Sequence, residues 1–237
     1  MLPVMIIRHV EHEGAGYLQE VLNRFKVPVV NVNIDRGDKI PVNLHDFSGL
    51  VLMGGPMSVN DPLEWVLAEI NLVKLAIDNN LPVLGHCLGG QIIAKALDVD
   101  VKLNSVVEIG WHTTRKLAGS EADLWVSGLD DEMLLYHWHS ETFELPVGAI
   151  PILASDYCKN QGFVYGNTLA LQCHIEMTEE MVTTWCEINK KNLNTSHSVQ
   201  SVDDMLSDLP IKIAGLHEIA DKLYSIWIKA LVKKQTL

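Results

Sequence analysis

A cysteine between glycines is the first candidate for chemistry in this sequence. Cys87 is the centre of Gly-His-Cys-Leu-Gly at 85–89, behind the apolar run 81–84 and ahead of a helical pattern that reaches Leu97. This context predicts a strand–turn–helix elbow, in which glycines permit a tight turn that pushes the side chain outward. The helix N-terminus behind the sulfur favours the thiolate. We therefore predict that Cys87 is a nucleophile, although most cysteines are small buried hydrophobes.

His174 and Glu176 are the candidates for the base and for the group that orients it. They follow the apolar run 169–173, which predicts a buried strand, and residues two apart on a strand share a face. Glu176 would then fix the tautomer of His174, and His174 would take and return the proton of the nucleophile. Cys173 lies within the apolar run without flanking glycines, so we assign it to the core.

Gly54-Gly55-Pro56 follows another apolar run, at 49–53. An ordinary tight turn would account for it. The functional alternative is a backbone donor: the N–H of Gly55 would stabilise a developing oxyanion, with the N–H of Leu88 as the second donor. A residue without Cβ allows the substrate to approach the backbone closely.

His137 and His139 form the main competing constellation, a metal site. Two histidines at strand spacing could ligate a metal ion, with His86 or His112 as a third ligand. No cysteine or carboxylate cluster in the sequence completes a convincing site, so we expect neither a metal nor a cofactor. A place for His139 in the substrate pocket is the intermediate interpretation.

Strands and helices alternate in the first part of the chain. This order predicts a parallel sheet covered on both faces, with ligands beyond the carboxyl ends of its strands. We expect strands at 4–8, 27–34, 49–53 and 81–84, and helices at 14–25, from an N-cap at Asp61 to 79–80, and at 91–97.

From about residue 99 the pattern changes to short extended runs, which predict antiparallel additions. These runs are 106–109, 124–126, 134–138, 152–154 and 162–165, before a last buried strand at 169–174. The expected fold class is α/β: a flavodoxin-like three-layer sandwich with a mostly parallel central sheet and a small antiparallel extension.

The tail is expected to extend the same domain. We expect one domain over 1–188 and, over 189–237, a polar loop and a helical extension packed on it, with a capping box at 201–204 and a helix at 212–233. If exposed, the stripe of Leu216, Ile219, Leu223 and Ile226 would mark a contact with a second subunit, for example in a homodimer.

Composition excludes several classes of protein. The chain has 237 residues, 48% of them hydrophobic, and a formal net charge of −12, which argues against binding to nucleic acid or to an anionic membrane. No apolar run approaches the about 18 residues of a membrane span, and residues 1–8 lack the features of a signal peptide. Four scattered cysteines suit a reducing cytoplasm better than a disulfide framework.

Taken together, the motifs at 54–56, 85–91 and 174–176 resemble those of class I (triad) glutamine amidotransferases in order and spacing. The nearest likeness is to the glutaminase domain of GMP synthetase and its stand-alone relatives, and the segment 137–146 resembles their histidine segment ending in Leu-Pro. The resemblance covers about residues 4–185. It implies Cys87 as nucleophile, His174 as base, Glu176 as its orienter, Gly55 and Leu88 as the oxyanion hole, and Gly54, Gln91 and His139 as substrate-binding residues.

Three departures from that pattern matter. Ile175 replaces the proline found between His and Glu in most relatives, and Met57 follows Pro56 where many have a small or acidic residue. No ATP-pyrophosphatase motif follows the core, so we expect ammonia from glutamine to go to a separate synthetase subunit. The alternatives are a free-standing γ-glutamyl hydrolase or peptidase acting on γ-glutamyl amides, and a non-catalytic regulatory binding module of the same fold.

Overall fold

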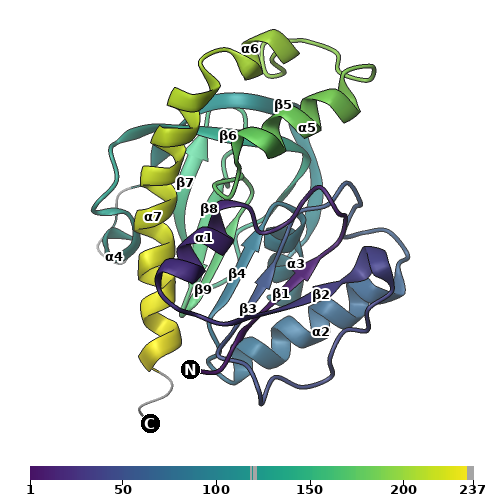
Figure 1. The fold of residues 1–237 in the computed structure, drawn as a ribbon, viewed down its shortest axis with the longest axis vertical. Coiled ribbons are helices and arrows are strands. Elements are labelled where there is room, and N and C mark those ends of the chain that lie inside the picture. The colour runs from purple at the N-terminus through teal and green to yellow at the C-terminus, as the bar shows by residue number, and fades with distance from the viewer. Residues whose placement is uncertain (118, 120–121, 234–237) are drawn as a thin grey trace.

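The fold is known from a computed structural model that describes residues 1–117, 119 and 122–233 (Figure 1). Within these residues a nine-stranded sheet runs in the order β2-β1-β3-β4-β9-β8-β7-β5-β6. The strands are β1 (Val4–Arg8), β2 (Val29–Asn33), β3 (Gly49–Leu52), β4 (Val83–His86), β5 (Val101–Lys116), β6 (Glu132–Phe143), β7 (Ile150–Ser155), β8 (Gly162–Tyr165) and β9 (Thr168–Leu171).

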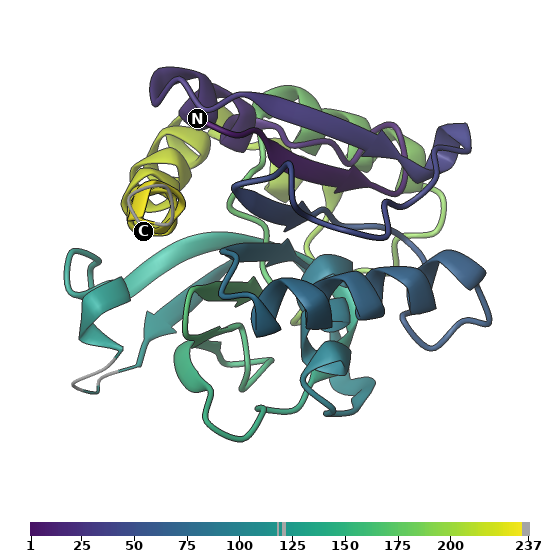
Figure 2. The ribbon, with the colours of Figure 1, turned by 90° about the horizontal axis from the view of Figure 1, so that it is seen from below.

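Helices cover both faces of the sheet (Figure 2). The alternation of β1 shows why: Val4 and Ile6 belong to the core under α1 and α7, whereas Met5 and Ile7 belong to the core under α2 and α3. The helices are α1 (Tyr17–Arg24), α2 (Glu64–Asp78), α3 (Leu88–Ala96), α4 (Asp123–Val126), α5 (Glu179–Asn189), α6 (Val202–Leu206) and α7 (Leu209–Lys233), with a 3₁₀ turn at Ile34–Arg36.

The parallel half of the sheet positions the candidate site. Strands β2, β1, β3, β4 and β9 are mutually parallel, and the remaining pairs are antiparallel. The carboxyl ends of β1, β3, β4 and β9 therefore share one edge, where the chain continues into His9, Gly54, Cys87 and His174. The expected α/β three-layer class, with a parallel centre and an antiparallel extension, is confirmed.

Two expected elements in the antiparallel half are wrong. Residues 124–126 lie in helix α4 and not in a strand, because Ala122, Trp125, Val126 and Leu129 follow helical spacing and all pack into the core. The run 106–109 is only the middle of β5, which continues to residue 116 as the partner of β6 and β7.

Two boundaries in the parallel half also differ from expectation. Helix α2 begins at Glu64 with Leu63 at its N-cap; the Asp61 carboxylate instead accepts a hydrogen bond from the backbone N–H of Ser58, at 2.9 Å. Strand β9 ends at Leu171, so residues 172–176 form bends beyond the sheet.

The C-terminal segment packs on the sheet. Ser201 caps α6 by accepting the N–H of Asp204 at 3.1 Å, as the sequence predicts. Along α7, Leu216 and Leu223 are fully buried, and Ile219 and Ile226 are partly buried against the same core. The stripe is therefore not an exposed contact surface, while the boundary at residue 188 stays a prediction. No helix in 1–117, 119 and 122–233 is both long and apolar enough to span a bilayer.

Candidate active site

Cys87 occupies a strained turn between β4 and α3. Its backbone has φ 49° and ψ −108°, in the left-handed half of the map, and it is the N-cap of α3. The N–H of Cys87 donates to the carbonyl of Leu171 at 2.8 Å, which ties the turn to β9. Such strain in a residue without glycine's freedom persists only where the surroundings enforce it, and it concentrates at functional sites.

The glycines beside Cys87 are required by the close approach of α3 to the sheet. A Cβ on Gly89 would lie 2.2 Å from the carbonyl oxygen of Leu52, and a Cβ on Gly90 would lie 2.5 Å from that of Leu171. Both contacts are with backbone, which cannot move aside. The two glycines thus let the helix pack directly behind the sulfur.

His174 and Glu176 form a buried pair beside the elbow. His174 Nδ1 donates to Glu176 Oε1 at 2.7 Å, and both side chains are almost fully buried. Strand alternation does not bring them together, because β9 has already ended. Instead, the N–H of His174 donates to the carbonyl of Tyr136, and the carbonyl of Glu176 accepts from the N–H of Tyr17. The loop is held from both neighbouring elements.

The charges of this pair favour an imidazolium. Burial alone would lower the pKa of His174, but the Glu176 carboxylate and the Cys87 thiol raise it well above its usual value. Burial would raise the pKa of Glu176, but His86 and His174 hold it below its usual value. His174 Nε2 has no conventional hydrogen-bond partner among the described residues, which leaves it for the Cys87 sulfur.

Helix α7 reaches this pair through a tyrosine that sequence reasoning missed. The hydroxyl of Tyr224 lies 2.9 Å from His86 Nε2, which in turn lies 3.6 Å from Glu176 Oε2. Burial lowers the pKa of His86, so it is neutral beside the carboxylate. No local motif could have shown this link, since Tyr224 and His86 are joined only by the tertiary fold.

The Gly54–Gly55 loop lies against the catalytic candidates. A Cβ on Gly54 would lie 3.2 Å from His174 Cε1 and 3.8 Å from Cys87 Cβ. A Cβ on Gly55 would lie 2.9 Å from the Leu88 side chain. The two segments named as the oxyanion hole are therefore adjacent, and only glycine fits between them.

A cavity of about 530 Å³ opens above Cys87. It is lined by Cys87, His174, Gly55, Gln91 and His139, whereas Glu176, Leu88 and Gly54 lie behind this lining. The volume is in the range of small-molecule sites. The structure thus brings every site residue expected from the sequence to one place, in or directly behind one cavity.

Gln172 also belongs to this cavity and was missed. Its side-chain amide donates to Cys87 Sγ at 3.6 Å, and its oxygen accepts from the Gln91 amide at 3.2 Å. It stands in a loop immediately before Cys173, where the sequence predicts only strand. Gln91 also approaches the carbonyl of Glu141 at 3.4 Å, so it links the elbow to the β6 segment.

Glu13 is a second missed carboxyl group in the cavity wall. A Cβ on Gly54 would lie 2.5 Å from its Oε2, so it reaches the loop beside His174. Burial raises its pKa to about 7, and the nearby Glu176 adds to the shift against the opposing effects of His174 and His9. Glu13 therefore gains or loses its proton near neutral pH.

The raised pKa of Glu13 predicts a loss of stability as pH rises. From an ordinary 4.5 to about 7, it favours the folded state at low pH, and that contribution is lost as pH rises through 7. Glu13→Gln should reduce the drop in unfolding free energy between pH 5 and pH 8 by about 2–3 kcal/mol. Urea unfolding at both pH values measures it, with the exposed Glu20→Gln as control. An unchanged drop would contradict the prediction.

A buried polar cluster lies below His139. His139 Nε2 lies 3.0 Å from Glu108 Oε2, and His137 Nδ1 lies 3.8 Å from Glu108 Oε1. The possible third ligands named from the sequence do not join them: His86 pairs with Tyr224, and His112 bonds backbone carbonyls. The carboxylate that the sequence pattern did not supply is Glu108, whose donor atoms lie within 4.8 Å of both histidines.

This cluster is held together as a hydrogen-bond network. Burial would raise the pKa of Glu108, but His139 and His137 lower it to about 2. Gln161 Nε2 donates to Glu108 Oε2 at 2.6 Å, and the carbonyl of Glu141 lies 3.0 Å from His139 Nδ1. The network therefore fixes the His139 ring in the cavity wall.

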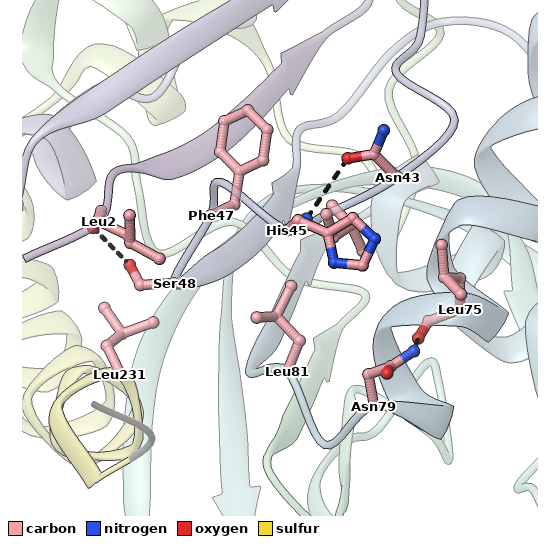
Figure 3. Close-up of a pocket in the computed structure, with 10 residues that line it drawn as sticks. Leu2, Asn43, His45, Phe47, Ser48, Leu75, Asn79, Leu81 and Leu231 are labelled. Atoms are coloured by element: carbon pink, nitrogen blue, oxygen red, sulfur yellow. Dashed lines mark hydrogen bonds between the residues drawn. The ribbon is translucent and has the colours of Figure 1, made fainter. Parts of the chain in front are cut away.

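A second hollow, of about 440 Å³, lies at the opposite edge of the sheet (Figure 3). Its wall includes Leu2, Phe47, Leu81 and Leu231, beside the amino ends of β1, β3 and β4. Among its described lining residues only His45 is titratable, and no nucleophile other than the Ser48 hydroxyl, which is bonded to the Leu2 carbonyl, is present. The hollow has no pair of groups that could perform acid–base chemistry.

Comparisons with known proteins agree with the site. Residues 13–184 match the family model described as glutamine amidotransferase class-I. The chain is 30% identical over 213 residues to the glutamine amidotransferase-like protein YfeJ of Salmonella typhimurium, over 85% of this chain and 88% of that one. It is 32% identical over 118 residues to a subunit of the glutamine-hydrolysing GMP synthase of Sulfolobus acidocaldarius, over 50% and 60% of the chains.

A solved structure is similar over nearly the whole chain. The crystal structure of a glutamine amido transferase from Methylobacillus flagellatus superposes with a TM-score of 0.94 at 39% identity, covering 97% of this chain and 95% of that one. The shared region includes both the elbow and the C-terminal helix.

Proposed function

The chain belongs to the class-I glutamine amidotransferase family, and we propose that it releases ammonia from the side-chain amide of glutamine with Cys87, His174 and Glu176. The observation that carries the proposal is the position of Cys87. The sulfur lies at a strained elbow, in one cavity with a histidine that a buried carboxylate orients. A purely structural cysteine needs none of these features.

In the proposed reaction the Cys87 thiolate attacks the γ-amide carbon and forms a tetrahedral intermediate. The imidazolium of His174 gives its proton to the departing nitrogen, which leaves as ammonia, and a γ-glutamyl thioester remains. Neutral His174 then takes a proton from water as the water attacks this thioester. Collapse of the second intermediate releases glutamate and restores the thiolate.

Substrate contacts follow from the cavity wall. The N–H groups of Gly55 and Leu88 stabilise the negative oxygen of both intermediates. Gln91 and the fixed ring of His139 hold the glutamyl part, and Gly54 leaves room for it beside His174. Glutamine, or a γ-glutamyl amide of similar size, is the proposed substrate.

We propose that the ammonia is used by a separate acceptor enzyme. The support is the similarity to the Sulfolobus acidocaldarius protein, since that relative is named as one subunit of a larger synthase. Co-purification of an ATP-using partner that stimulates glutamine hydrolysis is the expected result. The nature of the acceptor is not encoded in the residues of this cavity.

The test is a substrate screen of the isolated protein. Ammonia and glutamate are measured with glutamine, γ-glutamyl methylamide, γ-glutamyl peptides and, as a control, asparagine. Turnover of glutamine, with labelling of Cys87 by 6-diazo-5-oxo-norleucine, would support the proposal. Turnover of γ-glutamyl peptides alone would indicate a hydrolase of those peptides, and neither turnover nor labelling would indicate a binding module.

A further inference from the structure

A buried ion pair lies directly behind the Gly54–Gly55 loop. His9 follows β1 and Glu69 lies on α2, and neither side chain has any exposed surface. His9 Nε2 lies 3.2 and 3.1 Å from the two carboxylate oxygens of Glu69. On the other side of the ring, His9 Nδ1 lies 2.9 Å from the carbonyl oxygen of Gly54. Neither residue lines the cavity, and the proposed reaction does not use them.

The partners of His9 determine where its protons lie. A carbonyl oxygen only accepts, so Nδ1 carries a proton and donates it to Gly54. The Glu69 carboxylate accepts the proton of Nε2, and the ring is therefore an imidazolium. Burial would lower the pKa of His9, but Glu69, the Gly54 carbonyl and the charge of Glu13 raise it. Trp65 covers the ring at a centroid distance of 5.0 Å.

The peptide between Gly54 and Gly55 connects this pair to the catalytic groups. In a trans peptide the C=O and the following N–H point in opposite directions. Glycine on both sides leaves this peptide free to rotate, because no Cβ limits either residue. A Gly54 carbonyl held by His9 therefore directs the Gly55 N–H away from His9.

The other side of the loop is where charge develops in the reaction. Gly54 packs against His174 and Cys87, and Gly55 packs against Leu88 and lines the cavity. The position of the loop explains how the chain comes near the oxyanion. The His9 bond explains which of two peptide orientations it adopts there.

We propose that His9, held by Glu69, is a positioning residue that locks the Gly54–Gly55 peptide with the Gly55 N–H directed at the oxyanion. The inference rests on the proposed function, because an oxyanion forms only if Cys87 attacks a carbonyl. His9 acts through the peptide and touches neither the substrate nor the reacting atoms.

Paired variants in a Glu69→Gln background test this role without leaving a buried charge unpaired. His9→Asn keeps an N–H donor near the position of Nδ1, whereas His9→Leu removes it. The leucine variant should lose about 10²–10³-fold in kcat, as expected for one oxyanion donor, with KM changed by less than about threefold. The asparagine variant should stay within about tenfold of the wild-type kcat.

Alkylation separates positioning from damage to the nucleophile. Reaction of Cys87 with iodoacetamide passes through no oxyanion, so its rate should be equal in wild type and in both variants. Equal kcat in the two variants would overturn the proposal, because the donor would be dispensable. A loss of alkylation in parallel with kcat would also overturn it, because the sulfur itself would be affected.

Nitrogen-15 NMR of histidine-labelled wild-type protein covers the case in which a variant does not fold. Both ring nitrogens of His9 should carry protons at pH 7, and an unprotonated Nδ1 would overturn the proposal. If wild-type protein releases no ammonia from any γ-glutamyl amide, the proposed function fails instead. The NMR result would then still report whether His9 holds the Gly54 carbonyl.

Discussion

Cys87→Ala is expected to reduce glutamine hydrolysis by about 10⁴-fold or more, because no other group in the cavity can form the thioester. The residual rate would come from binding and from the oxyanion donors acting on water. The change removes one sulfur atom and keeps Cβ, so the elbow, its φ of 49° and the packing of α3 should persist. Ammonia release at saturating glutamine, with thermal unfolding measured in parallel, checks both parts.

The matched control is Cys158→Ala. Cys158 is also buried and contacts the Thr142 hydroxyl at 3.2 Å, but it lies outside the cavity lining. This variant should retain wild-type turnover per folded molecule. Undiminished hydrolysis by Cys87→Ala would rule out the thioester mechanism, and equal losses in both variants would indicate a general effect of removing a buried sulfur.

The elbow could be predicted because its determinants are local. Glycines on both sides of Cys87, an apolar strand before it and a helix after it lie within one short segment, and the structure keeps that order. The contacts explain the pattern: Gly89 and Gly90 meet the backbone of β3 and the end of β9. A sequence records such a requirement directly, since only glycine satisfies it.

The pairing of His174 with Glu176 was expected for a reason that the structure does not support. Alternation along a strand would place both side chains on one face, yet β9 ends at Leu171. Tertiary hydrogen bonds to Tyr136 and Tyr17 shape the loop instead. Contacts between segments far apart in the chain leave no periodic signal, which is also why Tyr224, Glu108 and Glu13 were missed.

Helix α4 shows a different limit. Three apolar residues at 124–126 suggested a strand, but the burial of Ala122, Trp125, Val126 and Leu129 follows a helical period. In so short a window both periods fit, and packing against the core decides between them. Leu124, which the strand assignment would bury, is 76% exposed.

Glu176→Gln tests the electrostatic part of the triad and should lower kcat by about 10²–10⁴-fold, by analogy with loss of the carboxylate in other triads. Gln can still accept the Nδ1 proton of His174, so the geometry is largely kept. The charge is lost, and with it the main influence that raises the pKa of His174 against the effect of burial. Less of the Cys87 sulfur is then held as thiolate, so its alkylation by iodoacetamide at pH 7 should slow as well.

That double effect distinguishes Glu176 from the residues of the oxyanion loop, whose loss should spare alkylation. Glu180→Gln, an exposed position in the first turn of α5, is the matched control and should change neither rate. The folded protein also loses stability in Glu176→Gln: the pKa of Glu176 is held below its ordinary 4.5, so its contribution is present above that pH and disappears as pH falls. A variant with normal alkylation but slow hydrolysis would show that Glu176 orients His174 without setting the charge of the sulfur.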